Sequence, residues 1–419
     1  MVLSYYDIII IGSGMAGLFS AYNIKNISPE TSFLILEKNP KKLIGGRAGH
    51  EMFYGTRIVT GAGIGRKPKD KLLLKLVKDL NIPFKFFEVN PNYSKLVDKV
   101  DITKIMDILR EKYDKLSPSE KEEVKAMTFG QFAKSVLGLD LYKKFIISTG
   151  YSDYVNADVE ETLYNYGMDD NACCWEGFGF SWSDLVAKLY NYIGPEHFKF
   201  NNMVTKISKL KFHPLVYTVE TNNGSIHYAR KIIIAGTIQT IRNLLPTYQI
   251  YKQIESQPFL RLYGKFSNNS IPIMKKYIQG YTVLPGPLQK IIPMDVDKGV
   301  YMIAYNDNTN TITFKNHLKN NETNRELFAQ FLEASIGIPK NSLQLIAIKP
   351  YYWTSGTHYY KPLNKKKYKS RDEFVYLAQH PANGIIVAGE VVSQKQGWVE
   401  GALESVKTVI NKNWIDTKF

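Results

Sequence analysis

The chain has 419 residues, of which 44% are hydrophobic, 13% aromatic and 22% charged, so its composition is that of a globular protein and excludes a disordered or fibrous one. Since domains commonly contain about 100–200 residues, this length predicts two or three structural units. The 54 Lys and Arg against 39 Asp and Glu give a formal net charge of +15. Such a charge is compatible with nucleic acid, anionic membranes or acidic ligands as partners.

Two stretches carry much of the positive charge, residues 66–78 and 361–371. The second has no helical stripe of apolar residues, and we expect a solvated loop there. No nucleic-acid-binding motif accompanies either stretch, so nucleic acid is not the expected partner.

The chain has two cysteines, Cys173 and Cys174, which are adjacent. This pattern excludes a disulfide framework and a cysteine-rich metal site, and it leaves either two buried thiols or a strained vicinal disulfide. The sequence contains no signal peptide and no apolar run of the ~18–20 residues that a membrane span needs. We therefore expect an intracellular, cytoplasmic protein without a bound metal or a membrane span.

The N-terminal segment has the pattern of a dinucleotide-binding unit. A continuous β-branched run, 7–11, predicts a buried parallel strand, and residues 18–25 predict a helix. Between them, Gly12 permits a tight turn, Gly14 lets the backbone approach a pyrophosphate, and Gly17 lets the helix lie close to the strand. The helix N-terminus supplies free N–H groups and a positive dipole end for the phosphates.

A second predicted strand, residues 32–36, ends at Glu37, which lies twenty residues after Gly17. An acidic residue at this place accepts hydrogen bonds from the adenosine ribose hydroxyls. Together with the glycines it predicts a nucleotide site for either NAD or FAD. Two further glycine segments follow at residues 45–47 and 61–63.

The middle of the chain alternates helical and strand patterns. Helices are predicted at residues 102–113 and 127–137, with a helix start at 117–120 between them. Strands are predicted for the segments 202–207, 231–236, 259–266, 300–305 and 311–314.

The C-terminal part contains a second motif. A short buried strand, 384–388, brings Gly389 and Glu390 to its tip, and the segment 396–405 then opens a helix that extends to about residue 410. This Ala-Gly-Glu…Gly-Trp-Val-Glu-Gly-Ala-Leu-Glu-Ser pattern, with the Gly-Gly-Arg at 45–47, resembles the flavin amine oxidase superfamily. One position departs from the resemblance, because Val59 stands where the family usually has an acidic residue.

The resemblance implies FAD as the cofactor. It places Val204 on the adenine side, Glu390 near the ribityl or phosphate oxygens, and the helix start at Trp398 against the pyrimidine edge of the flavin, where a positive helix end favours the reduced state. The segment 353–360 has no Cys, so FAD is expected to be non-covalent, with His358 as the alternative attachment point. The residues expected to bind FAD are Gly12, Gly14, Met15, Ala16, Gly17, Glu37, Lys38, Gly45, Gly46, Arg47, Gly61, Ala62, Val204, Gly389, Glu390, Trp398, Val399 and Ala402.

The resemblance also implies an aromatic cage against the flavin, with Trp398 as one wall and Tyr359 or Tyr360 as the other. The alternative is that these rings fill core space. Arg261 falls where many family members have a Lys that holds a water, and Lys265 shares its strand face by period-two alternation. Because Arg does not accept protons at neutral pH, it suits an anionic substrate group better than a catalytic base.

The function implied is an FAD-dependent oxidase. An activated substrate C–H would give a hydride to flavin N5, and oxygen would reoxidise the flavin and form hydrogen peroxide. The net charge and Arg261 favour a neutral or acidic small molecule over a polyamine. The alternatives are a desaturase, isomerase or mutase of the same fold, or a catalytically divergent FAD-binding protein that binds a partner; the oligomeric state is open.

The predicted fold class is α/β, with a Rossmann-like FAD-binding domain interleaved with an α+β substrate-binding domain. The FAD-binding domain is assigned to residues 1–88, 180–256 and 375–419. The substrate domain is assigned to a helical insertion at 89–179 and a sheet-rich stretch at 257–374.

Overall fold

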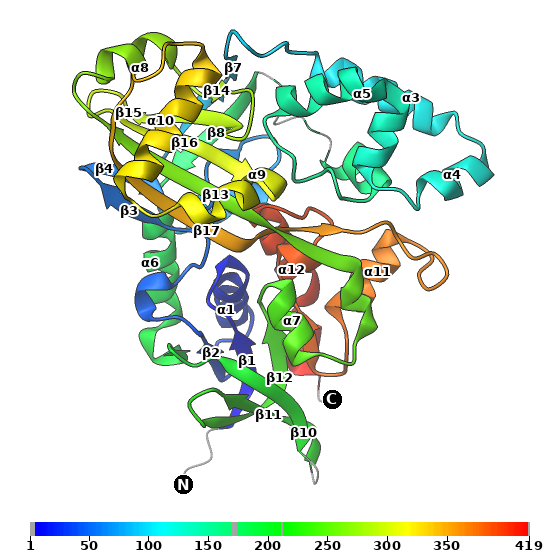
Figure 1. The fold of residues 1–419 in the computed structure, drawn as a ribbon. Helices are drawn as coiled ribbons and strands as arrows, with labels where there is room; N and C mark the ends of the chain where they lie inside the picture. Colours follow the sequence, from blue (N-terminus) through cyan, green and yellow to red (C-terminus); the bar gives the residue numbers. More distant parts are fainter. Residues whose placement is uncertain (1–4, 167, 169–171, 173, 211–212, 418–419) are drawn as a thin grey trace.

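The computed structural model describes residues 5–166, 168, 172, 174–210 and 213–417; Cys173, and with it the question of a vicinal disulfide, lies outside them. Figure 1 shows three parts: a lower part built on a parallel sheet, an upper part built on an antiparallel sheet, and a helical lobe beside the latter. No helix in the described ranges is both long and apolar enough to cross a membrane.

The lower sheet has β1 at its centre, paired in parallel with β2 and β12. Residues 8–11 are buried on both faces, as their continuous β-branched run predicts. In spatial order, the strands are β10 (Val204–Leu210), β11 (His213–Thr221), β12 (Ile226–Ile234), β1 (Tyr5–Ile11), β2 (Phe33–Leu36) and β9 (Phe198–Lys199), and β18 (Ile385–Val387) pairs in parallel with β12.

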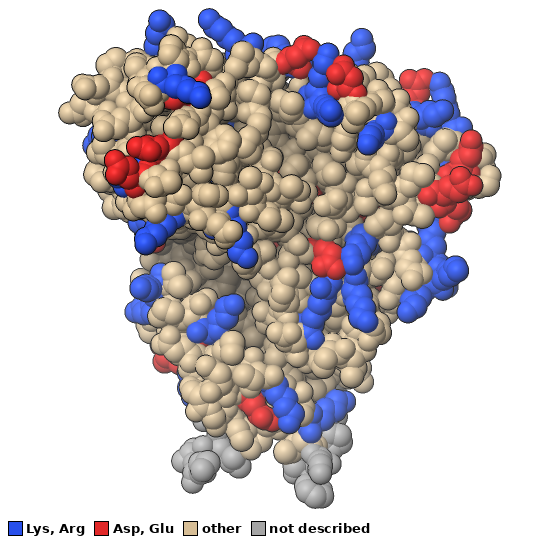
Figure 2. Space-filling view, in the orientation of Figure 1, with Lys and Arg blue, Asp and Glu red and all other residues tan. Residues whose placement is uncertain are grey.

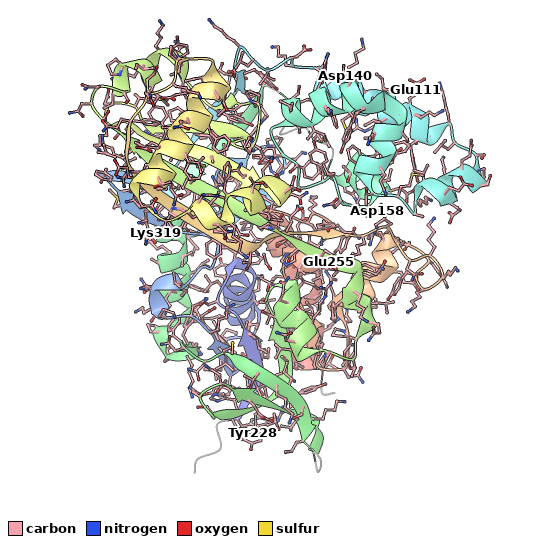
Figure 3. All side chains as sticks on the ribbon, in the orientation of Figure 1. Glu111, Asp140, Asp158, Tyr228, Glu255 and Lys319 are labelled. Carbon is pink, nitrogen blue, oxygen red and sulfur yellow. The ribbon has the colours of Figure 1, made fainter. Side chains whose placement is uncertain are left out.

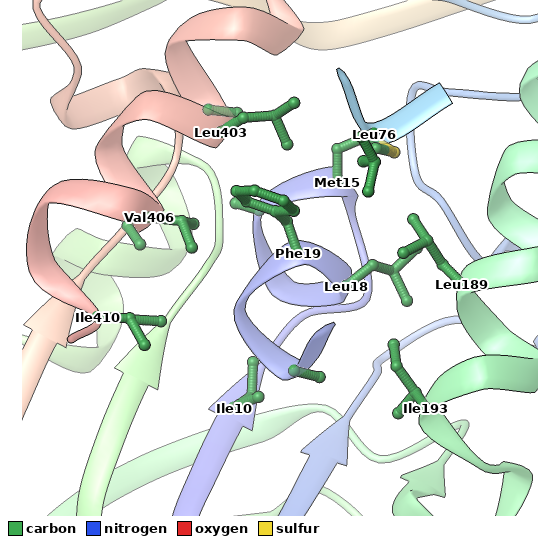
Figure 4. Close-up of a cluster of buried hydrophobic side chains, with 14 of the residues drawn as sticks. Ile10, Met15, Leu18, Phe19, Leu76, Leu189, Ile193, Leu403, Val406 and Ile410 are labelled. Atoms are coloured by element: carbon green, nitrogen blue, oxygen red, sulfur yellow. The ribbon is translucent and has the colours of Figure 1, made fainter. Parts of the chain in front are cut away.

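Helices cover both faces of this sheet. On one face, α1 (Met15–Ile27) lies between α6 (Trp182–Ile193) and α12 (Val399–Val409). Figure 4 shows Leu18 facing Leu189 and Phe19 facing Leu403 in the core that these helices share. Buried side chains of α7 (Ile238–Leu244) and α11 (Arg371–Gln379) belong to the core on the other face.

The loop between β1 and α1 brings the helix unusually close to the strand. Gly12 has φ +104°, a left-handed conformation that favours glycine, and a Cβ there would lie 2.6 Å from the Ala235 carbonyl oxygen. A Cβ on Gly17 would collide with the Gly12 carbonyl oxygen. The turn and the close approach predicted for these glycines are therefore both present.

The upper sheet is mainly antiparallel. In spatial order its strands are β17 (Leu345–Tyr360), β13 (Ile254–Phe266), β16 (Val300–Asp307), β15 (Lys290–Asp295), β14 (Thr282–Val283) and β7 (Asn92–Tyr93). Its core includes buried residues of α8 (Ile271–Tyr277) and α10 (Glu322–Ile336).

The strand predicted for residues 311–314 is wrong: these residues belong to α9 (Asn308–Phe314). The β-branched residues favour a strand locally, but Thr311 and Phe314 are three apart and both are buried on one helix face. The Phe314 ring lies 5.0 Å from the Phe328 ring of α10, so tertiary packing overrides the local preference.

The helical lobe follows the predicted pattern, with α3 (Ile102–Asp114), α4 (Pro118–Val124) and α5 (Phe129–Thr149). Ser117 and Glu120 form a capping box at the start of α4. Helix α5 extends beyond the predicted end at residue 137 and is kinked at Gly138, which has φ +75°.

The remaining elements are short. They are the hairpin of β3 (His50–Phe53) and β4 (Thr56–Val59), the three-stranded sheet of β5 (Gly65–Arg66), β8 (Trp175–Phe180) and β6 (Phe84–Val89), and the helices α2 (Lys71–Asp79) and α13 (Lys412–Asp416).

The predicted domain boundaries at 179/180 and 256/257 fall inside β8 and β13, and the division into domains stays a prediction. The basic segment 361–371 forms ion pairs with two other parts of the chain. Lys361 pairs with Glu255 of β13 at 2.7 Å, and Arg371 pairs with Asp158 of the helical lobe at 3.0 Å. Figure 3 shows Asp158 at the base of the helical lobe and Glu255 at the junction below it. The expected solvated loop is thus partly an ion-paired linker.

Gly17→Ala is expected to lower the free energy of unfolding by about 1–3 kcal/mol, because its methyl group would meet the Gly12 carbonyl. Gly14→Ala is the matched control: Gly14 has φ −70° and open space at its Cβ position, so no collision is expected and the loss, that of an N-cap glycine, stays below about 1 kcal/mol. Urea unfolding of the flavin-free proteins measures both values. Equal losses in the two variants would contradict the close contact.

Candidate functional site

A cavity of about 1700 Å³ extends along the junction of the lower and upper parts. Figure 2 shows the surface hollowed between these parts. Every residue predicted for the cofactor or for catalysis lines the cavity, with the exceptions of Gly17 and Lys265. Gly17 lies behind the loop, where it permits the helix–strand contact.

The glycine loop and the start of α1 form one wall. Gly14 is the N-cap residue of α1, and a Cβ built on it meets nothing within 4 Å. The first backbone N–H groups of a helix have no partners within the helix and favour anions. Beside it, Gly45 donates its N–H to the Ser13 carbonyl at 2.9 Å and forms a bridge with Gly14, so the two glycine segments lie together.

Glu37 lies buried at the end of β2, next to this loop. Its Oε2 accepts hydrogen bonds from the Ser13 N–H at 2.8 Å and the Ser13 hydroxyl at 2.9 Å, and its Oε1 accepts one from the Asn39 N–H at 2.8 Å. These bonds fix the carboxylate at the cavity wall. Lys38 and Val204 line the same end of the cavity.

Glu390 joins four segments at the centre of the site. Its Oε1 accepts hydrogen bonds from Arg47 at 3.0 Å and from His358 Nδ1 at 2.5 Å, and its Oε2 accepts one from the Gly397 N–H at 3.1 Å. The sequence assigned Glu390 to cofactor oxygens; in the structure much of its hydrogen-bonding capacity is used by the protein itself. Arg47 also donates to the Gly356 carbonyl at 2.5 Å, which ties the glycine segment 45–47 to β17.

The neighbours of Glu390 determine its pKa and the position of the ring proton on His358. Burial would raise the pKa of the Glu390 carboxyl, but contacts with His358 and the charge of Arg47 outweigh burial and hold the pKa at about 2. His358 Nε2 accepts the Ile238 backbone N–H at 3.1 Å, and this leaves the ring proton on Nδ1, facing Glu390. Both ring nitrogens of His358 are therefore engaged.

The C-terminal motif is held in place by its own polar residues. Glu400 accepts hydrogen bonds from the Leu72 and Leu73 N–H groups at 2.8 and 2.9 Å, at the start of α2. Ser405 accepts the Gly389 N–H at 2.7 Å, which fastens α12 to the end of β18. A Cβ on Gly401 would collide with the Lys395 carbonyl oxygen, so the motif glycine permits the tight turn into α12.

Trp398 lines the cavity with a fixed orientation. Its indole N–H donates to Asp70 at 2.8 Å, and its ring meets Trp182 edge to face with centroids 6.2 Å apart. Of the two tyrosine candidates on β17, Tyr360 is fully buried, donates to the Ser393 carbonyl at 2.9 Å and packs against Phe374. Tyr359 is only half-buried.

Of the two predicted cations on β13, Arg261 reaches the cavity and Lys265 does not. Arg261 is 2% exposed, and its Nε donates to the Gly61 carbonyl. Lys265 lies four residues further, roughly 13 Å along the strand, and its Nζ donates to the Phe266 carbonyl at 2.6 Å. The prediction that either cation could reach the site is therefore wrong for Lys265. Side chains on one face of a strand can lie at different positions along it, and only Arg261 lies at the cavity.

A further buried cation of the cavity, Lys290, was missed by the sequence analysis. It begins β15 and is 1% exposed, and its ammonium lies 4.1 Å from the centroid of Tyr305. The Arg261 guanidinium lies at the same distance from that centroid. The available signal was a Lys directly before the apolar pair Ile291 and Ile292, but only the tertiary structure places it, like Arg261, beside the Tyr305 ring.

A dinucleotide-type parallel sheet joined to an antiparallel sheet over one large cavity is the two-part architecture of the flavin amine oxidases, as the motifs implied. Solved structures with this fold include a putrescine oxidase bound to putrescine (12% identity, TM-score 0.73, 96% of this chain and 98% of that one). They also include cyclohexylamine oxidase from Brevibacterium oxydans IH-35A (16% identity, TM-score 0.73, 96% and 97%). At these identities the likeness establishes the fold alone. No protein-family model matches the chain, and no curated protein matches its sequence.

Glu390→Gln is expected to lower the free energy of unfolding at pH 7 by about 3 kcal/mol, because Arg47 and His358 lose a charged partner. The folded-state pKa of about 2 lies below the ordinary 4.5, so this contribution is present above pH 4.5 and is lost as pH falls towards 2. The difference between wild type and variant should therefore narrow on acidification. Urea unfolding between pH 3 and 7 measures it.

Glu404→Gln, on the nearby helix α12, is the control. Its ion pair with Lys395 is partly exposed, so a change of about 0–1 kcal/mol is expected. A Glu390 difference that does not vary with pH, or that equals the Glu404 difference, would contradict the role of the buried carboxylate.

Proposed function

We propose that the protein is an FAD-dependent oxidoreductase that oxidises an activated C–H bond of a small molecule. The observation that supports this most directly is the cavity, because it gathers the predicted residues from distant parts of the chain. Its volume of about 1700 Å³ exceeds the roughly 300–1,000 Å³ of an ordinary ligand pocket. A dinucleotide and a substrate therefore fit in it together.

The wall residues fit FAD. The start of α1 would bind the pyrophosphate at Gly14, where the missing side chain leaves open space. Glu37 would hold the ribose hydroxyls, and the segment 45–47 with the start of α12 would flank the flavin ring. When bound, FAD supplies the capacity to take two electrons from the substrate and pass them to oxygen.

We expect FAD to be held without a covalent bond. The segment 353–360 contains no Cys, and Cys174 is exposed. His358, the alternative attachment point, is buried and has both ring nitrogens hydrogen-bonded, to Ile238 and Glu390. A bond to either nitrogen would break one of these contacts.

Acid precipitation of the holoprotein is therefore expected to release all of the flavin into the supernatant. Gly14→Trp should yield flavin-free protein, because its side chain would occupy the space at the start of α1. Absorbance at flavin wavelengths measures both results. Flavin that stays in the pellet would contradict non-covalent binding, and stoichiometric FAD in Gly14→Trp would contradict the placement of the pyrophosphate.

On the substrate side, Trp398 and Tyr359 are the proposed cage walls. Trp398 is oriented by Asp70, whereas Tyr360 is committed to the core, which favours Tyr359 of the two tyrosines. Arg261 occupies the inner cavity as a fixed positive charge and does not act as a base. A neutral or acidic substrate is favoured over a polyamine, because a polyamine would meet like charges there.

The proposed reaction removes two electrons and two protons from the substrate. For an amine, one C–H bond and one N–H bond break and a C=N bond forms, while oxygen takes up both electrons and both protons to become hydrogen peroxide. The cavity walls would position the substrate carbon at the reacting centre.

Anaerobic mixing with amines, amino acids and sugar nucleotides tests this function. At least one amine or amino acid is expected to bleach the flavin spectrum, with peroxide formed when air is admitted. Bleaching by no compound, with FAD bound, would contradict oxidase function and favour a non-redox or partner-binding role. Sugar nucleotides probe the mutase alternative directly.

Trp398→Ala should keep stoichiometric FAD but lower kcat/KM at least about tenfold, a loss of roughly 1.4 kcal/mol of transition-state stabilisation. Tyr376→Ala, which removes an exposed ring on α11 outside the cavity lining, is the control and should leave kcat/KM unchanged. Unchanged kinetics in Trp398→Ala would remove the cage assignment.

A further inference from the structure

We infer that Asp70 is a positioning residue for the proposed reaction and that it acts by holding the ring of Trp398 in one orientation. The inference rests on the proposed function and deepens it, since it adds a residue to the machinery of the same cavity. Trp398 lines the cavity, whereas Asp70 lies behind it and accepts the indole N–H at 2.8 Å.

Asp70 is available for Trp398 because another residue caps its helix. Asp70 is the N-cap residue of α2, and from that position a carboxylate normally accepts the N–H of the second or third helical residue. It makes no such bond. Glu400 of α12 accepts these two N–H groups instead, from Leu72 at 2.8 Å and Leu73 at 2.9 Å. The starts of α2 and α12 therefore exchange carboxylates, since Trp398 is in turn the N-cap residue of α12.

The Asp70 carboxylate is itself fixed in direction. Its side chain is fully buried. Its Oδ2 accepts the backbone N–H of Arg66 at 2.7 Å, and its Oδ1 accepts Nη2 of the Arg66 guanidinium at 2.8 Å. Hydrogen bonds to an ionised carboxylate are roughly twice as strong as those between neutral groups. Rotation of the carboxylate would break several of them, so the direction in which it meets the indole is set.

The Trp398 ring depends on this hydrogen bond because core packing does not enclose it. Trp398 is half-buried, with one side at the cavity. Trp182 meets it edge to face with centroids 6.2 Å apart, and the Arg66 guanidinium lies 5.8 Å from its centroid. Trp182 is anchored by its own indole N–H, which donates to the Gly63 carbonyl at 2.7 Å. Ring contacts limit the space around Trp398, but only a directional bond selects one rotation of the ring.

A rotated wall would misplace the substrate. A misplacement of about 1 Å at a reacting centre can cost on the order of a hundredfold in rate. Asp70 does not line the cavity, so its effect on turnover passes through Trp398. It should therefore alter kcat more than KM, and it should lose its effect when the indole N–H is absent.

Asp70→Asn tests the first expectation in the FAD-loaded protein. The amide places an N–H₂ donor where Arg66 donates, so the side chain is expected to turn and release the indole. A fall of about tenfold in kcat is expected, with KM changed by less than about twofold. Asp79→Asn is the matched control at the other end of α2, where the carboxylate forms an exposed pair with Lys75 and its loss should leave both constants unchanged.

Trp398→Phe tests the second expectation, because it keeps a ring and removes the indole N–H. It should also lower kcat, and Asp70→Asn added to it should lower kcat by less than about twofold more. Losses that multiply in the double variant would overturn the inference. If Asp70→Asn fails to fold, wild-type kcat in Trp398→Phe would overturn it equally.

The indole N–H signals of the ¹⁵N-tryptophan-labelled holoprotein give a readout that needs no substrate. The chain has five Trp, and the Trp398 signal is the one missing from Trp398→Phe. Asp70→Asn is expected to shift this signal more than the other four and to speed its exchange with solvent, whereas Asp79→Asn should leave it in place. An unmoved Trp398 signal would overturn the inference.

The two proposals fail in different ways. Oxidation of a substrate with wild-type kcat in Asp70→Asn would overturn the role of Asp70 and leave the oxidase function standing. Bleaching of the flavin by no compound would overturn the oxidase function, and the indole signals would still test the hold of Asp70 on Trp398.

Discussion

The arrangement of the site depends on one buried carboxylate. Glu390 stands at the tip of β18 and binds Arg47, His358 and the Gly397 N–H, so it connects segments that are more than 300 residues apart in the chain. Since a buried charge is stable only when it is paired and hydrogen-bonded, the partners have little freedom to move away. The glycine segment, the long strand β17 and the start of α12 are thereby fixed around one cavity.

The motifs that resemble flavin amine oxidases have a structural role as well as the cofactor role implied for them. Glu400 holds the start of α2, Ser405 holds the end of β18, and Glu37 is held by Ser13. These polar side chains are committed to protein groups, so the walls of the cavity are held in place by the protein itself. What they present to a ligand is largely backbone N–H groups, small residues and fixed rings, which suits a large planar cofactor.

The positively charged side chains of the protein lie in two different environments. Between the parts of the molecule, the partly exposed Lys361 and the largely buried Arg371 are paired with acids and join these parts. Inside the cavity, Arg261 and Lys290 are held on the Tyr305 ring. A surface charge is screened within a Debye length of about 8–10 Å, whereas a buried charge acts strongly on whatever enters the cavity.

The sequence by itself determined the parallel strand, the glycine loop, Glu37 and the C-terminal helix, because these depend on local periodicity and on the conformations that glycine allows. Nearly all of the residues that it assigned to the cofactor and to catalysis line the cavity. Only the tertiary structure decided that residues 311–314 are helical, that Arg261 and not Lys265 reaches the cavity, and that Lys290 joins it. It also decided that Glu390 binds His358. These outcomes depend on which strands pair, how deep a side chain lies and which helix covers it, and those relations join residues far apart in the chain that no local pattern connects.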